Sequence, residues 1–395
     1  MKRVKKLIAV ITAGILSLLG VSCSISNSGS DSSAENKKWE YLIEGVTEVK
    51  NVILMIGDGM GPEQIKAGEI YKGESLVMQQ FPYKVRVNTD SLSGTTDSSA
   101  AATAMATGRS ILNGCVGLDA NAYLEDDPTA EMETIIDIAS AMGKRTGVLT
   151  TEVLYGATPM GFSAHNFFRD HSLELLESAA KNSNVNLFAS ETINKDYYQY
   201  FTKNGYTEIP SVSDISTATQ DKIFGTYNIK ASAESMTAIV DVAFDYLITE
   251  ALDYLSQDED GFFLMAEGAH IDHGGHNNDM RYMLEELLAF DDAIKAVLEW
   301  TKGRTDTVVI VTADHECGSL MLGPEVTHEN ILEEKNGKPV NYMWGSTGHS
   351  ATEVFCFING VDLDFSQYSR RSKNAIKNTD IFEIVYDLLH NTINV

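Results

Sequence analysis

The stretch Asn51-Val-Ile-Leu-Met-Ile-Gly-Asp58-Gly-Met-Gly61 decides the fold. It begins with an unbroken apolar run, which is typical of a strand buried on both faces of a parallel sheet. The run stops at a cluster of glycines around the carboxylate of Asp58. In open α/β sheets, ligands bind beyond the carboxyl ends of the strands. We therefore expect Asp58 to lie at a functional site.

Similar apolar runs follow along the chain, and helical stretches separate them. The predicted strands are 146–150, 261–266, 307–311 and 353–358, and the predicted helices are 98–107, 131–142 and 280–300. This alternation predicts an α/β protein, a three-layer α/β/α sandwich around a mainly parallel sheet. Residues 185–232 are rich in Tyr, Thr, Ser and Asn and show little periodicity, so we expect an irregular insertion there.

The composition excludes some classes of protein. The chain has 395 residues with 30 Lys or Arg and 56 Asp or Glu, which gives a formal net charge of −26. We expect no nucleic-acid binding, because a chain this acidic offers little positive charge to neutralise phosphates along a groove. Apolar residues make up 43% and charged residues 22%, which is a globular composition. We expect one domain over residues 39–395.

The N-terminal segment predicts export. A basic start precedes an apolar run over residues 7–21, which is shorter than the ~20 residues of a membrane-spanning helix. This order predicts a signal peptide over residues 1–22. The run ends at Leu19-Gly-Val-Ser-Cys23, which resembles a bacterial lipobox, so we expect a periplasmic or cell-surface protein anchored to the membrane by a lipid on Cys23. An ordinary cleaved signal peptide is the alternative, and residues 23–38 predict a flexible tether.

Aspartate and histidine residues gather at strand ends and in one helical turn. In Asp272-His-Gly-Gly-His276 a carboxylate and an imidazole are four residues apart, which places them on one face of a helical turn. Asp314-His315 directly follows a predicted strand, and His349 ends the segment Ser346-Thr-Gly-His349. Zinc prefers imidazole and carboxylate ligands, and the repetition of such groups predicts a metal site.

A serine opens the alanine-rich helix in Thr95-Thr-Asp-Ser98-Ser-Ala-Ala-Ala102. The amino end of a helix offers free N–H groups and a positive dipole, which favour an alkoxide or a bound phosphate. The alternative is that Ser98 or Ser99 only caps the helix. The sequence has no G-x-S-x-G motif, so nothing supports a Ser-His-Asp hydrolase.

Taken together, these segments resemble the alkaline phosphatase family of the bacterial periplasmic and mammalian type. The resemblance runs from about Asn51 to Phe357, and the motifs occur in the family's order. The motifs are Ile56-Gly-Asp-Gly-Met-Gly61, Thr96-Asp-Ser98, Ala164-His165 with Arg169, Glu267-Gly-Ala-His-Ile-Asp-His273, Thr312-Ala-Asp-His-Glu316 and Thr347-Gly-His349.

The resemblance implies a phosphate monoester hydrolase that works through a phosphoserine intermediate with two zinc ions and one magnesium ion, and it implies a homodimer. Ser98 would be the nucleophile, and Arg169 would clamp the phosphate. The implied metal ligands are Asp272, His276 and His349 for the first zinc, Asp58, Asp314 and His315 for the second, and Asp58, Thr158 and Glu267 for the magnesium.

The chain departs from the family pattern at a few positions. Gly156, two residues before Thr158, stands where relatives carry Asp or His, and Ser99 stands where they usually carry Ala. His273 occupies a second position that tunes the magnesium and phosphate sites in relatives, where Lys or His is found. These departures leave the implied zinc ligands untouched, and they bear on magnesium affinity, turnover and pH optimum.

Two alternatives to a phosphomonoesterase stay open. A phosphodiesterase or sulfatase of the same superfamily would keep the fold, but such relatives usually lack an equivalent of Arg169. A non-catalytic surface lipoprotein would predict a degraded metal site, whereas every implied ligand position is intact.

Overall fold

The computed structural model describes residues 42–119, 131–230, 241–368 and 375–393. The chain divides into the units Met1–Lys38 and Trp39–Val395, and all described residues belong to the second unit. The expected signal peptide, tether and lipidation site at Cys23 lie outside the described residues. Within the described part of the chain, no helix has the length and apolarity that crossing a membrane requires.

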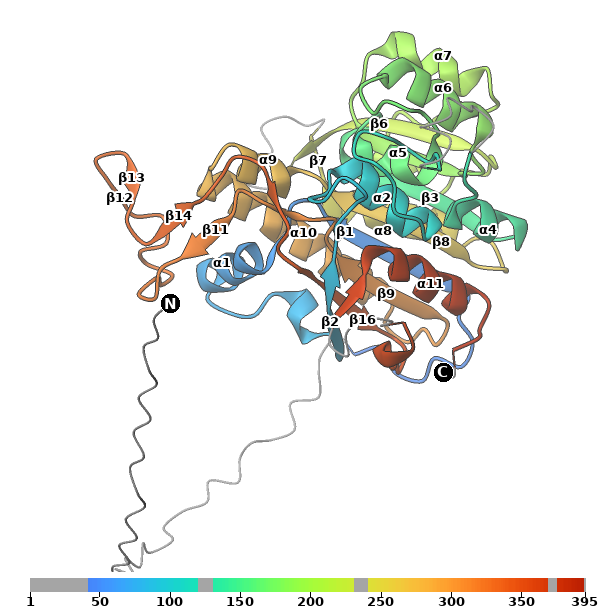
Figure 1. Ribbon diagram of the computed structural model, residues 1–395. Helices are drawn as coiled ribbons and strands as arrows, with labels where there is room; N and C mark the ends of the chain where they lie inside the picture. The colour runs from blue at the N-terminus through green and yellow to red at the C-terminus, as the bar shows by residue number, and fades with distance from the viewer. Residues whose placement is uncertain (1–41, 120–130, 231–240, 369–374, 394–395) are drawn as a thin grey trace, which may run out of the picture. The chain divides into compact units, whose positions relative to one another are not determined.

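A large, mainly parallel sheet forms the centre of the second unit (Figure 1). Its antiparallel pairings within the described chain are those that β16 makes with its two neighbours. In spatial order the strands are β17 (Ala375–Lys377), β2 (Tyr83–Asn88), β16 (Val354–Asn359), β9 (Thr307–Thr312), β1 (Asn51–Gly57), β8 (Phe262–Gly268), β3 (Arg145–Val153), β4 (Leu187–Glu191), β6 (Ile223–Lys230) and β5 (Thr207–Glu208), with β7 (Asp241–Ala243) paired to β6.

The helices form two groups that cover the sheet, so the molecule has three layers (Figure 1). One group contains α2 (Ser98–Thr107), α4 (Ile135–Ala141), α5 (Ala157–Ser163), α6 (Ser172–Asn182), α7 (Tyr198–Thr202) and α11 (Asn378–Leu389). The other contains α1 (Pro62–Lys72), α8 (Phe244–Leu255), α9 (His270–His276) and α10 (Met280–Trp300). Short 3-10 helices are η1 (Val77–Gln80), η2 (Lys195–Tyr197), η3 (Val212–Asp214) and η4 (Phe365–Gln367). The three-layer α/β/α prediction is confirmed.

Residues 316–350 carry small two-stranded sheets outside the central one (Figure 1). The pair β10 (Glu316–Cys317) and β15 (His349–Ser350) places His349 opposite Cys317. The other pairs are β11 (Leu320–Leu322) with β14 (Tyr342–Trp344), and β12 (Glu334–Lys335) with β13 (Lys338–Pro339). This segment therefore connects the end of β9 to His349.

The expectation of an irregular insertion over residues 185–232 is wrong. Leu187–Glu191 and Ile223–Lys230 are strands of the central sheet, and Tyr198–Thr202 is a helix. In β6, buried and half-buried residues alternate over the last five positions, so polar residues such as Thr226 and Asn228 fit a strand near the sheet edge. The polar composition of the segment therefore masked the two-residue alternation that is typical of a strand.

The register of the parallel strands brings their carboxyl ends together. Glu267 on β8 lies opposite Ile56 on β1 and opposite Thr150 on β3. On the other side of β1, Ile56 lies opposite Thr312 on β9. The residues that follow β1, β9 and β3 are therefore neighbours at one edge of the sheet.

Candidate metal centre

The first candidate group consists of the carboxylate of Asp272 and the imidazoles of His276 and His349. Asp272 and His276 lie one turn apart in α9, and β15 brings His349 to them. Nε2 of His276 lies 3.1 Å from Asp272 Oδ2 and 3.2 Å from Nε2 of His349. Nε2 of His349 lies 3.5 Å from Asp272 Oδ1. The ligand atoms of the three side chains therefore meet at one point.

Backbone carbonyls hold the outer nitrogen of both histidines. Nδ1 of His276 lies 2.6 Å from the carbonyl oxygen of Thr347, and Nδ1 of His349 lies 3.0 Å from that of Thr96. Because a carbonyl only accepts, each Nδ1 carries a proton and each Nε2 faces inward. Two Nε2 atoms 3.2 Å apart beside a carboxylate need a shared proton or a cation between them. Carbonyl partners of this kind orient metal-binding imidazoles.

The thiol of Cys317 lies in the same cluster. Its Sγ is within 4.8 Å of the ligand atoms of Asp272, His276 and His349. Cys317 is fully buried, and burial, followed by the Asp272 carboxylate, raises the pKa of the thiol. Two imidazoles and one carboxylate suffice for a catalytic zinc site, which keeps one position open.

Asp58, Asp314 and His315 form the second candidate group, directly after β1 and β9. Nε2 of His315 lies 3.1 Å from Asp314 Oδ2 and 3.5 Å from Asp58 Oδ1. The backbone N–H groups of Gly59 and His315 donate to Asp314 Oδ1, which directs Oδ2 into the group. All three ligand side chains are buried. The rings of His315 and His349 stack with 3.5 Å between centroids, so the two groups are adjacent.

Glu267 and Thr158 mark a third position. Oε2 of Glu267, at the end of β8, accepts a hydrogen bond from the Thr150 hydroxyl on β3. Glu267 Oε1 and Thr158 Oγ1 are buried, and neither has a hydrogen-bond partner among the described residues. A buried polar atom without a partner costs ~1–3 kcal/mol, so these oxygens are suited to a ligand.

The centre carries more negative charge than its own residues neutralise. Burial, followed by neighbouring carboxylates, raises the pKa of Asp58 and Glu267 well above the usual range and that of Asp314 to about 7. Asp58 Oδ1, Asp272 Oδ1 and Asp314 Oδ2 have no hydrogen-bond partner in the described part of the chain. Bound cations stabilise carboxylates in such a position. The mixed imidazole and carboxylate donors fit zinc, and the oxygen donors at the third position fit magnesium.

Ser98 is the first residue of α2 and faces the second group. Its Oγ lies 3.2 Å from Nε2 of His315, and the side chain is buried. The residue that caps α2 is Asp97, whose Oδ1 accepts from the backbone N–H of Ala100 at 3.0 Å. Ser99 donates its hydroxyl hydrogen bond to the same Asp97 carboxylate. The alternative that Ser98 or Ser99 serves as the helix cap is therefore wrong.

Asp97, which directly precedes Ser98, also forms an ion pair with Arg169. Nη1 of Arg169 lies 3.1 Å from Asp97 Oδ2, which also accepts from the backbone N–H of Gly114. The backbone N–H of Arg169 donates to Gly114 O at 2.7 Å. The arginine side chain is 34% exposed, so its guanidinium is anchored on one side and accessible on another. Asp97 was not among the predicted site residues, although its place directly before the helix could have identified it as the cap.

The two expected tuning positions are neighbours of candidate ligands in the sequence, Gly156 of Thr158 and His273 of Asp272. Gly156 precedes α5, and His273 is exposed on α9 with its ring 4.8 Å from that of His270. The sequence-based prediction missed Glu152, whose carboxylate lies against Gly156. Glu152 stands at the carboxyl end of β3, so the rule that drew attention to Asp58 could have found it.

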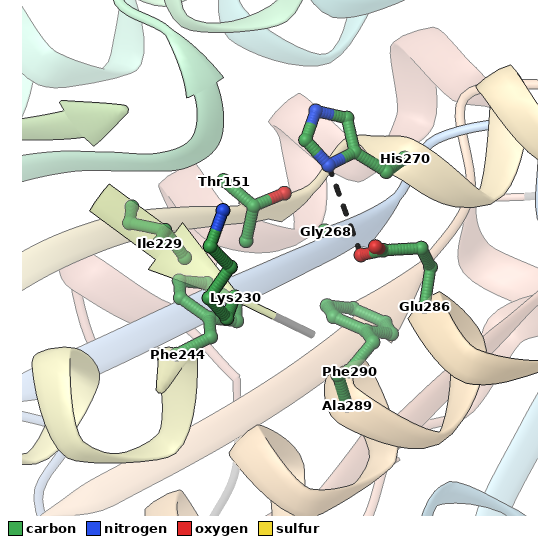
Figure 2. Close-up of a pocket in the computed structure, with 9 residues that line it drawn as sticks. All are labelled: Thr151, Ile229, Lys230, Phe244, Gly268, His270, Glu286, Ala289 and Phe290. Carbon is green, nitrogen blue, oxygen red and sulfur yellow. Dashed lines mark ion pairs between the residues drawn. The ribbon is translucent and has the colours of Figure 1, made fainter. Parts of the chain in front are cut away.

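A small cavity borders the centre without being part of it (Figure 2). In it, Nδ1 of His270 lies 3.8 Å from Oε2 of Glu286, and the side chain of Lys230 extends toward Thr151. Its lining, drawn from the described residues, includes none of the predicted ligands: Thr151, Ile229, Lys230, Phe244, Gly268, His270, Glu286, Ala289 and Phe290. The candidate site is therefore the metal-ligand cluster and not this cavity.

The chain is similar to known proteins of one family. The family model described as alkaline phosphatase matches residues 49–201 and 223–383. Alkaline phosphatase 3 of Bacillus subtilis is 29% identical over 355 residues, which cover 81% of this chain and 71% of that protein. Alkaline phosphatase of Escherichia coli is 28% identical over 86% of this chain and 85% of its own length. The solved structure of alkaline phosphatase from the Antarctic bacterium TAB5 has a TM-score of 0.72 at 27% identity and covers 87% of this chain and 99% of that one. The chain therefore belongs to the alkaline phosphatase family of metal-dependent enzymes, which hydrolyse phosphate monoesters.

Proposed function

We propose that this enzyme hydrolyses phosphate monoesters through a phosphoserine intermediate at Ser98, with two zinc ions and one magnesium ion, and releases inorganic phosphate and an alcohol. The observation that carries the proposal is the position of the Ser98 hydroxyl, 3.2 Å from His315 Nε2 and next to the anchored Arg169. A nucleophile, two ligand groups and an anion-binding cation are thereby within reach of one small substrate group.

The residues divide among three cations. When bound, the ions would supply Lewis-acid stabilisation of the entering and leaving oxygens and lower the pKa of the Ser98 hydroxyl. The proposed ligands are Asp272, His276 and His349 for the first zinc, Asp58, Asp314 and His315 for the second, and Asp58, Thr158 and Glu267 for the magnesium.

Ser98 carries the covalent step. Its Oγ forms a bond to phosphorus while the bond from phosphorus to the alcohol oxygen breaks, and the alcohol leaves with a proton. A water molecule then attacks the phosphoserine, phosphate departs, and Ser98 Oγ regains its proton. The position of Ser98 at the first residue of α2 favours the negative charge that develops there, since the N–H groups of a helix start point outward.

Arg169 favours monoesters over diesters. A guanidinium presents paired N–H donors that match two non-bridging phosphate oxygens. A monoester dianion has three such oxygens and two negative charges, whereas a diester keeps two of them with a single charge, so the guanidinium attracts the monoester more strongly. The phosphodiesterase or sulfatase alternative is therefore less well supported than the monoesterase.

Export and assembly complete the proposal. We place the protein in the periplasm or on the cell surface, with a signal peptide over residues 1–22 and a lipid on Cys23. Replacing Cys23 with Ser is expected to release the protein from the membrane fraction, measured by fractionation and immunoblotting. Retention in the membrane fraction would contradict the lipid anchor.

We also propose that the enzyme is a homodimer. Sedimentation at micromolar concentration tests this proposal, and a monomer at that concentration would contradict it.

Replacing Ser98 with Ala is expected to lower kcat for p-nitrophenyl phosphate by at least about 10³-fold, because the nucleophile is removed. Ser99→Ala is the matched control, since it removes the neighbouring hydroxyl, which is bonded to Asp97, and we expect less than about a tenfold loss. Equal losses in both variants, or faster hydrolysis of the bis-ester by the unaltered enzyme, would contradict the proposed mechanism.

Arg169→Lys is expected to raise KM for the monoester and the inhibition constant of inorganic phosphate by about tenfold, because lysine keeps the charge and loses the paired donors. Lysine also loses the geometry of the Asp97 contact. The measurement is steady-state kinetics with phosphate as competitor. Unchanged phosphate inhibition would show that Arg169 does not hold the phosphoryl group.

The zinc affinity of the first group is expected to rise with pH. The hydrogen bond that His276 Nε2 donates to the Asp272 carboxylate raises the pKa of His276 to about 9, so zinc must displace the proton on Nε2. The proton stabilises the metal-free fold fully below the ordinary histidine pKa of ~6.5, and this contribution is lost as pH rises through 9. Competition with a chelating dye should show affinity rising about tenfold per pH unit below that value and then levelling. A pH-independent affinity would contradict the assignment, and His273→Gln, outside the group, should leave the slope unchanged.

A further inference from the structure

The backbone at position 156 does not require glycine. Gly156 has φ −59° and ψ 160°, an extended conformation that any residue adopts. It also precedes the first residue of α5, where Ser, Thr, Asp or Asn would stabilise the helix by accepting a backbone hydrogen bond. The absence of a side chain there needs a reason other than chain geometry.

The carboxylate of Glu152 fills the space that a side chain at position 156 would take. A Cβ atom built on Gly156 would lie 1.8 Å from Glu152 Oε1 and 2.4 Å from its Cδ. Both distances are far below van der Waals contact. Glycine at 156 therefore makes room for the acidic group that reaches in from β3.

Glu152 is part of the structure around the third metal position. Its backbone N–H donates to Thr150 Oγ1 at 3.1 Å, and the same hydroxyl donates to Glu267. Among the charged groups around Glu267, Glu152 raises the pKa of Glu267 the most. Among those around Glu152, Arg169 has the largest effect, and it lowers the pKa of Glu152. Unpartnered Thr158 Oγ1 lies two residues beyond Gly156, at the start of the same helix.

We propose that Glu152 is a positioning residue for the magnesium ion and sets the affinity of the site for it. Mg²⁺ usually keeps several water ligands in proteins, and a nearby carboxylate accepts hydrogen bonds from such waters. Glu152 adds its charge to those of Asp58 and Glu267 at the third position. This inference rests on the proposed function, because it assumes that the third position takes magnesium.

The test is a calorimetric titration of Mg²⁺ into the zinc-loaded, full-length enzyme and its Glu152→Gln variant. The variant is expected to bind Mg²⁺ about 10–100-fold more weakly, the usual effect of removing such a partner. Glu191→Gln is the matched control. Glu191 is the last residue of the neighbouring strand β4, and its substitution removes the same charge. An affinity of Glu152→Gln within about twofold of the unaltered enzyme, or an equal loss in the control, would overturn the proposal.

Two further variants keep the test independent of folding defects. Gly156→Ala forces the Glu152 carboxylate aside without removing its charge, and we expect weaker Mg²⁺ binding at unchanged zinc content. Combining Gly156→Asp with Glu152→Ala, whose short side chain vacates that space, returns a carboxylate to it and is expected to restore affinity. Failure of both would overturn the proposal even if Glu152→Gln does not fold.

The titration needs no turnover, so it separates this inference from the proposed function. Loss of Mg²⁺ affinity in an enzyme that does not hydrolyse monoesters would support Glu152 and reject the proposed reaction. Unchanged affinity in an active enzyme would reject only the role of Glu152.

Discussion

Mutual repulsion among buried acids at the carboxyl edge of the central sheet is the constraint on which the rest of the structure depends. Asp58, Glu267 and Asp314 stand at the ends of three adjacent parallel strands and are all buried. Their own surroundings supply too few positive groups, which is why burial and mutual proximity raise the pKa of each. A fold with this arrangement is most stable when it binds divalent cations, so stability and metal content are linked.

The remaining side chains of the candidate site come from helices and loops that lie next to this edge of the sheet. Helix α9 and strand β15 bring two imidazoles, helix α2 brings Ser98, and the turn into α5 brings Thr158. None of these side chains lies on a strand of the central sheet. The sheet therefore positions the acids, and the connections that leave it supply the proposed nucleophile and the remaining candidate ligands.

The fold and the clustering of the candidate ligands could be predicted from the sequence because each leaves a local signal. The apolar run before Asp58 marks a buried strand, and the spacing of Asp272 and His276 marks a helical turn. Strand β6 could not be predicted in this way, because buried and half-buried residues alternate over its last five positions and polar residues take half-buried ones. Strand β4 is buried over its first four residues, but it is only five residues long and ends in two polar residues. Asp97 and Glu152 act through contacts with residues distant in sequence or through the space left by a glycine. Spacing alone contains no such information.

The hydrogen bond between Nδ1 of His349 and the carbonyl oxygen of Thr96 joins segments 253 residues apart in the chain. Thr96 lies two residues before Ser98, so the peptide that leads into the nucleophile also sets the orientation of an imidazole in the first ligand group. The orientation of the His349 ring and the position of Ser98 are therefore linked through one peptide. A displacement of the start of α2 would act on this hydrogen bond, and a shift of the ring would act on the peptide before Ser98. The proposed nucleophile and a candidate ligand thus share one point of support, although they come from segments far apart in the chain.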